Sequence, residues 1–358
     1  MGDNRPHGGA KDIVTQNGYF LGNIGRANAA DADFVVLAGD LILGRAGKAN
    51  LISQKWDAYD KACKLFDMPY VSVAGNHDIW DKRSQRIWQE RYGPLWFSWD
   101  HKGCHFIALN SEVVGQTNKI TGLQLKWLKD DLENAASARR IFVFLHKPLW
   151  AGKQNQWNTV VHPLLAKYGV DTVFGAHCHQ YTLCPTKDGV RYVITGGAGA
   201  ELSGQELAGG FYHFLNVDVT GNTSDYKIIT ASGELPADCV TTQGVKKLKN
   251  AIKVEPLTKL PKTGPITIRV SVPNPTNRPV RALLVSNAGG SSWNIQTGQT
   301  IIPPKSRKTI IAKVAYKNAF PLPRSITVKL VDMNITRTLF SWQILNKLTS
   351  NISPPTKQ

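Results

Sequence analysis

Polar side chains that often bind metal ions follow a series of short apolar runs in this chain. The runs are continuous and rich in β-branched residues, a pattern typical of strands that are buried on both faces. Such strands form parallel sheets flanked by helices, and ligands bind to these sheets beyond the carboxyl ends of the strands. We therefore predict an α/β domain in which side chains far apart in the sequence converge on one site. These side chains are Asp3, which has no such run before it, and Asp40, Asn76, His77, Asp78, His146, His177 and His179.

The predicted strands and helices alternate along the first part of the chain. Strands are expected at 34–38, 70–74, 141–145 and 173–174, each just before one of these polar groups. Amphipathic helices are expected at 51–66, 123–135 and 157–168. The segments 80–93 and 151–158 are expected to be loops that shape a substrate pocket.

The donor groups in this series favour a hard or borderline divalent metal. Carboxylate, carboxamide and imidazole groups are present without an accompanying pair of cysteines, and Mn, Fe and Zn suit such ligands. An isolated histidine is usually structural, and we interpret His105 and His162 in that way because no motif supports them. Membership of the ordered series distinguishes His146, His177 and His179 from that background.

Several short motifs follow one another along the chain in a fixed order: Gly39-Asp40, Gly75-Asn76-His77-Asp78, His146 and Gly175-x-His177-x-His179. With these motifs the chain resembles the calcineurin-like metallophosphoesterase superfamily, in particular the branch of secreted, purple-acid-phosphatase-like enzymes. The resemblance covers residues 1 to about 232. It implies a two-sheet αββα sandwich and a dinuclear metal centre. It also implies hydrolysis of a phosphomonoester or phosphodiester by a metal-activated hydroxide.

The resemblance further implies which residues hold two divalent ions of unknown identity (Mn, Fe or Zn). The implied ligands are Asp3, Asp40, Asn76, His146, His177 and His179. Asp40 would bridge the ions. Asp3 and His179 would serve the first ion, and the remaining three residues would complete the second site.

The same resemblance assigns catalytic roles to the two residues that follow Asn76. His77 would face the phosphate ester as a general acid or as a hydrogen-bond donor to the transition state. Asp78 would orient His77 and fix its tautomer, as carboxylates beside functional histidines do.

The first motif departs from the family pattern, which is Asp-x-His with the histidine as a ligand. This chain has Asp3-Asn4-Arg5, and a guanidinium group has no lone pair to offer a metal ion. Three outcomes are open: water fills the position, His7 bends back to fill it, or the first site is weak and the centre largely mononuclear. We expect Arg5 to grip the substrate phosphate, which its forked guanidinium fits. An ion pair between Arg5 and Asp40 or another neighbour is the alternative.

The start of the chain also differs from the resembled fold, in which a central strand leads into the first aspartate. Here only Met1 and Gly2 precede Asp3. We therefore expect the native protein to begin upstream and to have lost that strand here. If the upstream part contains a signal peptide, the protein would be periplasmic or secreted. No apolar run in the chain is long enough to span a bilayer.

The rest of the chain has the pattern of an all-β domain. A connector with a short helix near 245–252 is expected at 233–261. Regularly spaced short strands follow, with Pro, Gly and Asn in the turns, and they predict an immunoglobulin-like β-sandwich at 262–347. Residues 348–358 are expected to form a disordered tail.

This second part also carries most of the charge. Residues 236–358 contain 19 Lys and Arg residues and three acidic residues, out of a net charge of +17 for the whole chain. Such a field attracts anionic polymers or a membrane surface. A simpler interpretation is that the charge only keeps the domain soluble. If the charge does attract such partners, the alternative to an enzyme is a catalytically weak envelope or polyanion-binding protein with a vestigial metal site.

Overall fold

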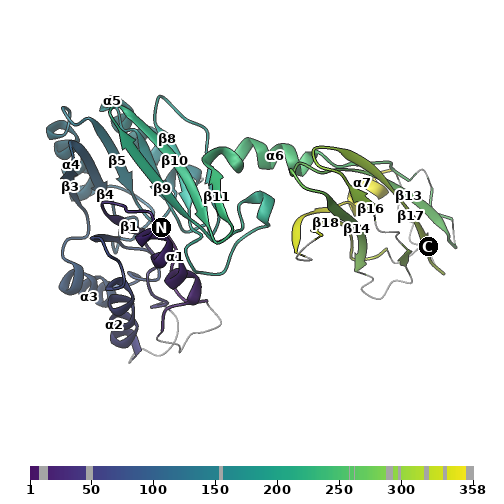
Figure 1. Ribbon diagram of the computed structural model, residues 1–358, viewed down its shortest axis with the longest axis horizontal. Helices are drawn as coiled ribbons and strands as arrows, with labels where there is room; N and C mark the ends of the chain where they lie inside the picture. Colours follow the sequence, from purple (N-terminus) through teal and green to yellow (C-terminus); the bar gives the residue numbers. More distant parts are fainter. Residues whose placement is uncertain are drawn as a thin grey trace. The chain divides into compact units, whose positions relative to one another are not determined.

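The computed structural model describes residues 1–7, 15–45, 51–152, 156–257, 259–261, 263–287, 293–296, 300–317, 322–333 and 337–351. The chain divides into two compact units (Figure 1). The first unit contains Met1–Gly204 and Gly209–Thr242, and the second contains Gln205–Ala208 and Gln243–Gln358. Among the described residues, no helix has both the length and the apolar character needed to cross a membrane.

A six-stranded sheet forms the largest part of the first unit, with the strand order β3-β4-β5-β6-β8-β7. The inner strands run parallel to one another, and the two edge strands are antiparallel to their neighbours. The strands are β3 (Phe97–His101), β4 (Cys104–Ala108), β5 (Arg140–Phe144), β6 (Thr172–Gly175), β7 (Tyr181–Leu183) and β8 (Arg191–Thr195). β5 and β6 confirm the α/β fold class and lie within one residue of the ranges predicted for them.

Alternation along these strands gives the sheet two apolar faces. Ile107, Val143 and Val173 belong to one buried cluster together with residues of the helices α4 (Gly122–Asn134) and α5 (His162–Lys167). The neighbouring positions on the same strands carry aromatic rings that stack across the sheet, such as Phe144 on Phe174 at a centroid distance of 5.0 Å. The sheet is therefore covered on both faces, as continuous apolar strand sequences require.

Two further sheets complete the first unit. β1 (Val35–Ala38) and β2 (Tyr70–Val73) form a parallel pair, and β9 (Phe214–Thr220), β10 (Thr223–Thr230) and β11 (Gly233–Pro236) form an antiparallel sheet. The helices α1 (Gly18–Asn28), α2 (Ile52–Cys63) and α3 (Lys82–Tyr92) share a buried apolar cluster with β1. Because β11 pairs with β10, residues 233–236 belong to a sheet of the first unit and are not part of a connector.

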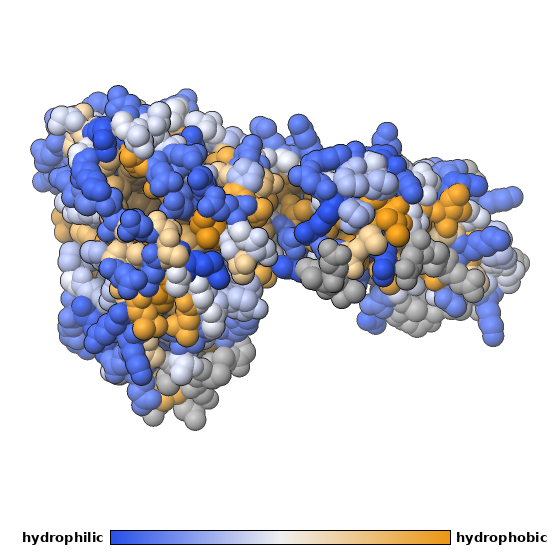
Figure 2. Space-filling view, in the orientation of Figure 1, coloured by the Kyte–Doolittle hydropathy of each residue, from blue (hydrophilic) through white to orange (hydrophobic). Residues whose placement is uncertain are grey.

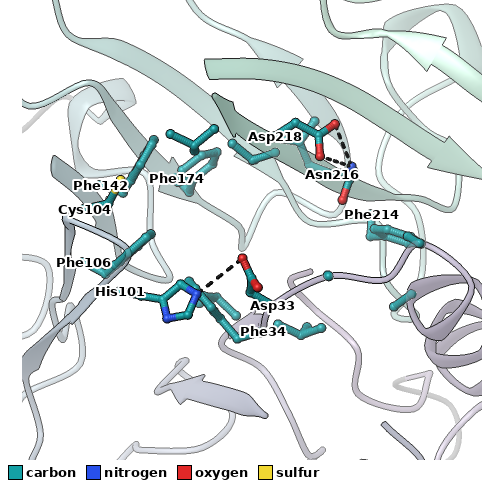
Figure 3. A pocket seen from close by; sticks show the side chains of 18 of the residues that line it. Asp33, Phe34, His101, Cys104, Phe106, Phe142, Phe174, Phe214, Asn216 and Asp218 are labelled. Atoms are coloured by element: carbon teal, nitrogen blue, oxygen red, sulfur yellow. Dashed lines mark hydrogen bonds and ion pairs between the residues drawn. The ribbon is translucent and has the colours of Figure 1, made fainter. Parts of the chain in front are cut away.

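A cavity of about 330 Å³ lies where β1, β9 and the aromatic face of the six-stranded sheet meet. Figure 3 shows Phe106, Phe142 and Phe174 on one side of it and Phe214 on the other. None of the predicted metal ligands lines this cavity. It is thus separate from the candidate metal centre described below.

One predicted loop is a helix in the structure. The segment 80–93 contains α3, which begins with a capping box: Asp81 accepts from the Ser84 backbone N–H, and Ser84 Oγ accepts from that of Asp81. Two reciprocal side-chain bonds satisfy amide groups that would otherwise be orphaned at the helix start. In the other predicted loop, a short turn of helix covers Leu149–Ala151 and a π-helical turn begins at Trp157, while 153–155 lie outside the described residues.

The second unit contains two antiparallel sheets of four strands each, with the orders β12-β13-β17-β15 and β16-β14-β18-β19. One buried apolar cluster takes residues from both sheets. The strands are β12 (Lys253–Val254), β13 (Ile266–Pro273), β14 (Val280–Asn287), β15 (Asn294–Gln296), β16 (Thr300–Ile302), β17 (Arg307–Ala315), β18 (Ser325–Asp332) and β19 (Thr338–Gln343). The helices are α6 (Thr242–Asn250), near the predicted connector helix, and α7 (Leu345–Thr349). α7 includes the first residues of the predicted tail, and 352–358 lie outside the described residues.

The outward positions of these strands carry both polar side chains and apolar ones, such as Ile311, which is 60% exposed. Along β17, for example, Ile310, Ala312 and Val314 are buried while Lys308 and Lys313 are exposed. Figure 2 shows hydrophilic side chains scattered among apolar ones on the visible face of this unit. The basic residues are therefore dispersed over the sheet surface, in agreement with the period of two in the sequence.

Candidate metal centre

The candidate ligands come from loops that follow strands of two different sheets. Asp40 follows β1 and Asn76 follows β2, whereas His146 follows β5 and His177 follows β6. Parallel strands bring their carboxyl ends to one edge, so these loops meet although they are up to 137 residues apart in sequence. The predicted convergence of distant residues is therefore present in the structure.

Glycines allow these loops to approach one another closely. A Cβ atom on Gly75 would lie 2.2 Å from the backbone nitrogen of Asp40, and one on Gly39 would lie 2.5 Å from His146 Nδ1. No side chain fits at such distances. Gly39 also has a φ of 86°, which favours glycine. The two glycines of the sequence motifs are thus required by the packing of the ligand loops.

Backbone strain is concentrated at the candidate ligands. A positive φ in a residue other than glycine costs about 1–3 kcal/mol and is retained where surrounding structure enforces it, often at functional sites. Four such residues lie here: Asp3 (φ 57°), Asp40 (φ 53°), His177 (φ 64°) and His179 (φ 50°). The strained backbone conformations are therefore a shared feature of these four candidate ligands.

One group of donor atoms is centred on the ring of His146. Its Nε2 lies 3.2 Å from Asp40 Oδ1, 3.2 Å from Asn76 Oδ1 and 3.2 Å from His177 Nδ1. Donor atoms about 2.0–2.1 Å from a tetrahedral zinc ion are separated from one another by about 3.3 Å. The spacing within this group therefore fits a bound divalent ion.

The contacts of His146 also fit that role. Its ring is fully buried, and Nδ1–H donates to the carbonyl oxygen of Ala38 at 3.0 Å, so that Nε2 is the nitrogen that faces the other donors. Against the effect of burial, the charges of Asp40 and Asp3 raise the pKa of this ring, so a bound metal ion would take the place of the proton on Nε2. Burial and the neighbouring His146 lower the pKa of His177 to about 4, so that ring is neutral at pH 7. Neutral imidazoles with a fixed tautomer are the form in which histidine binds metals.

A second group of donor atoms consists of Asp3, Asp40 and His179, which lie within 4.8 Å of one another. Asp3 is fully buried, and neither of its carboxylate oxygens has a hydrogen-bond partner among the described residues. Its Oδ1 lies 3.4 Å from His179 Nε2, and His179 Nδ1 bonds with the carbonyl oxygen of Glu201. A buried carboxylate without partners is costly, so this group calls for a nearby cation. The oxygen and nitrogen donors here suit a divalent metal.

His77 and Asp78 lie beside these groups, but not in the predicted arrangement. Asp78 accepts hydrogen bonds from the backbone N–H groups of Leu41, Ile42 and Gly75. His77 Nδ1 has no hydrogen-bond partner among the described residues. The predicted bond from Asp78 to the His77 ring is therefore wrong for this structure, because three backbone amides occupy the carboxylate. Asp78 instead ties the Asp40 loop to the Asn76 loop.

The pKa values of this pair follow from burial. Burial and the charge of Asp40 raise the pKa of Asp78 to about 8. Burial lowers the pKa of His77 to about 4, against the opposing charge of Asp40, whose Oδ2 lies 3.9 Å from His77 Nε2. His77 is thus a neutral ring that carries a single proton at pH 7.

Arg5 lies inside the centre, and His7 does not. The Arg5 Nε is 3.5 Å from Asp40 Oδ2, and its Nη1 is 3.1 Å from Glu201 Oε2. The ion pair with Asp40 that sequence analysis gave as an alternative is therefore present. His7 is exposed, and its Nε2 bonds with the hydroxyl of Tyr212 at 3.1 Å, so the structure offers no support for His7 as a replacement ligand.

Sequence analysis missed Glu201 and a pair next to His146. Glu201 lies 196 residues from Arg5, and no local pattern marks it as a partner. Lys147 forms a 2.7 Å ion pair with the buried Glu112. Two signals were available in the sequence. Lys147 directly follows the predicted ligand His146, and the acidic Glu112 comes shortly after the apolar strand β4. His105 and His162 lie outside the centre, each bonded to acidic side chains, as their structural interpretation expects.

Comparison with known proteins finds distant relatives among phosphatases. Purple acid phosphatase 23 of Arabidopsis thaliana is 28% identical over 150 residues, which are 36% of this chain and 32% of that protein. Serine/threonine-protein phosphatase CPPED1 of Bos taurus is 28% identical over 170 residues, which are 41% of this chain and 53% of that protein. The chain thus spans between a third and about half of the length of these relatives.

Among solved structures, the chain is similar to GAP50, the anchor in the inner membrane complex of Plasmodium. The TM-score is 0.41 at 13% identity, over 64% of this chain and 81% of that one. Residues 6–181 match the family model of the calcineurin-like phosphoesterases, and they include both helices and strands that position the candidate centre. The chain therefore carries a calcineurin-like metallophosphoesterase domain, distantly related to purple acid phosphatases and CPPED1 phosphatases.

Proposed function

We propose that the protein is a metal-dependent phosphoesterase, a phosphoric ester hydrolase acting on a phosphomonoester or a phosphodiester. The observation that supports this most is the set of 3.2 Å distances from His146 Nε2 to Asp40, Asn76 and His177. The similarity to acid phosphatases supports a phosphate ester as the substrate class.

The residues that would hold a divalent ion are Asp40, Asn76, His146 and His177. Asp3, Asp40 and His179 form a second donor group, which would hold a further cation. When bound, such ions lower the pKa of a coordinated water and neutralise charge on the phosphoryl oxygens. The buried oxygens of Asp3, which have no hydrogen-bond partner among the described residues, support the assignment of a cation to that side.

We propose that His77 and Arg5 handle the substrate. His77 is partly exposed and neutral, and its N–H would donate to an oxygen of the ester as charge develops in the transition state. The guanidinium group of Arg5 would bind a phosphoryl oxygen, which its fork of N–H donors fits. Asp78 would act only through the loops that it joins, because its carboxylate is occupied by backbone amides.

Hydrolysis of simple aryl esters tests this proposal. The full chain, stripped with a chelator, is given 4-nitrophenyl phosphate or bis(4-nitrophenyl) phosphate, and Mn²⁺, Zn²⁺ or Fe²⁺ is then restored singly and in pairs. We expect hydrolysis only after metal is restored, and the ratio of the two substrates separates a monoesterase from a diesterase. A folded protein that hydrolyses neither ester with any of these metals would contradict the proposal.

A non-catalytic role is the second candidate, and the charge of the second unit favours it. This unit carries 19 of the 43 Lys and Arg residues and only three of the 26 acidic residues. A polyanion or an anionic membrane surface is the partner that such a charge attracts. Sedimentation with heparin or with phosphatidylglycerol vesicles, compared at low and high salt, tests this candidate independently of hydrolysis.

We also propose the finer architecture that the resemblance implies. The sheets and helices of the first unit would form an αββα sandwich, and the second unit would be an immunoglobulin-like sandwich. Two antiparallel sheets that share one apolar cluster support the latter. A crystal structure with another strand order in the second unit would overturn it.

A further inference from the structure

Arg5 stands at the position where the family pattern has a metal-binding histidine, and its place is fixed by the backbone. Its N–H donates to the carbonyl oxygen of Asp40 at 2.9 Å, and its own carbonyl oxygen accepts from Asn17 Nδ2 at 2.8 Å. Only 7% of the side chain is exposed. The guanidinium is therefore held inside the centre and is not a surface group that happens to lie nearby.

The guanidinium contacts two of the three donors of the Asp3–Asp40–His179 group. Its Nε is 3.5 Å from Asp40 Oδ2, and its Nη2 is 3.5 Å from His179 Nε2. Because His179 Nδ1 bonds with the Glu201 carbonyl, Nε2 is the ring nitrogen that faces both Arg5 and Asp3. A guanidinium group has only donors. The guanidinium therefore lies where a metal ion held by Asp40 and His179 would need to be.

The two carboxylate oxygens of Asp40 face different groups. Oδ2 faces Arg5, whereas Oδ1 faces His146 in the other donor group. A second divalent ion on the Oδ2 side would lie beside a fixed positive charge that Glu201 and the carbonyl of Pro6 also hold in place. Like charges so close in a buried site repel strongly.

We propose that the Arg5 guanidinium replaces the first metal ion, so that the chain binds a single divalent ion through Asp40, Asn76, His146 and His177. This inference rests on the proposed function, because it assumes that the second donor group does bind a metal. The charge that the first ion would supply comes from a side chain and is present without metal. The centre is thus mononuclear, whereas the resemblance to the family implies a dinuclear one.

Counting bound ions tests this inference without relying on activity. The chelator-stripped full chain is titrated with Mn²⁺ by calorimetry, and bound Mn is then measured by elemental analysis and by electron paramagnetic resonance. We expect one ion per chain, with the six-line signal of isolated Mn²⁺. Arg5→His supplies the missing ligand, and we expect two ions and a spin-coupled signal. Arg5→Lys is the matched control, which keeps a positive charge, and we expect one ion.

Two further variants locate the single ion. His177→Ala should abolish its binding, whereas Asp3→Asn should leave one ion bound. Two ions in the wild-type chain, or loss of the single ion in Asp3→Asn with retention in His177→Ala, would overturn the inference while leaving the proposed function intact. No bound ion in the wild-type chain would overturn both. Circular dichroism of each variant verifies that it is folded. If Arg5→His does not fold, the wild-type count and the other two variants still decide.

Discussion

The two units of this chain differ in where they place polar groups. In the first unit, charged and polar side chains are buried at strand ends, several with positive φ and some without hydrogen-bond partners. In the second unit, buried and exposed positions alternate along β13 and β17, and the Lys and Arg residues of these two strands are exposed. The buried Asp332 of this unit is paired with Arg278. Burying polar groups costs free energy unless they are paired, so a fold retains them mainly where they have a task.

The unit with the larger net charge is not the unit to which we assign the chemistry. The second unit has a net charge of about +16 and the first is nearly neutral, yet we assign the chemistry to the first. All nine histidines are also in the first unit. Total charge therefore indicates which partners a unit attracts, whereas the position of a few buried side chains indicates what reaction it supports.

The largest expected effect comes from removing a ligand in the first unit. His177→Ala should reduce hydrolysis of an aryl phosphate to the background rate, because the neutral imidazole that faces His146 is lost, while the melting temperature changes little. Steady-state kinetics and thermal unfolding measure both quantities. His101→Ala removes a half-exposed histidine that contacts Asp33 and lines the separate cavity, and it serves as the matched control. A wild-type rate in His177→Ala would contradict the ligand assignment.

A second substitution separates catalysis from metal binding. His77→Ala should lower turnover by roughly 10²–10⁴-fold, the usual contribution of a proton donor or acceptor. Its metal content should remain near that of the wild-type chain, because we place the ring beside the donors and not among them. Elemental analysis of the purified variant provides the check. Loss of metal together with activity would assign His77 a different role.

A third substitution addresses the loops that carry the ligands. Asp78→Asn replaces one acceptor oxygen with an amide donor opposite a buried backbone N–H, such as that of Gly75 at 2.8 Å. Leaving a buried donor unsatisfied costs about 1–3 kcal/mol. Urea unfolding should show a loss of that size, accompanied by lower activity. An unchanged free energy of unfolding would mean that the carboxylate is not what joins the loops.

A smaller effect concerns the dependence of stability on pH. Histidines are the side chains that ordinarily titrate between pH 5 and 8, and all nine lie in the first unit. The hydrogen bond that Asp131 accepts from His105 Nε2 raises the pKa of His105 against the effect of burial. A raised folded pKa stabilises the protein below the unfolded value of about 6.5, and this stability is lost as pH rises through the folded pKa. His105→Gln should therefore lose about 1 kcal/mol at pH 6 and less at pH 9. Equal losses at both pH values would remove the titration from the explanation.

The smallest effect is expected in the second unit. Lys308→Gln and Lys313→Gln change exposed positions of β17 and should alter stability by no more than about 0.5 kcal/mol. The rate of aryl phosphate hydrolysis should not change. A clear loss of hydrolysis in the double variant would show that the basic unit takes part in catalysis, and the proposed division of labour would be wrong.

The sequence predicts the ligand loops well because two local signals coincide there. An apolar strand followed by Gly and a polar group fixes the place of Asp40 and Asn76, and both lie where expected. α3 was predicted as a loop although Asp81 and Ser84 form a capping box signal. The three-residue strands β15 and β16 are too short for periodicity to reveal.

Contacts between distant side chains were not accessible from the sequence. The acceptor role of Asp78 toward Leu41 depends on how two loops pack, and the local His77-Asp78 pair suggested a different contact. The ion pair of Arg5 with Glu201 joins loops that no motif links. Residue types at strand ends thus predict which groups gather, and the packing of the loops determines which of them touch.

The central claim is that a divalent ion bound in the first unit enables hydrolysis of a phosphate ester. The most direct measurement follows bound metal and the release of 4-nitrophenol in the same chelator-stripped sample as Mn²⁺ or Zn²⁺ is added. We predict no hydrolysis without metal, and a rate that rises in proportion to the ion bound until the site is full. Hydrolysis at an unchanged rate in excess chelator, or bound metal without any hydrolysis, would contradict the claim.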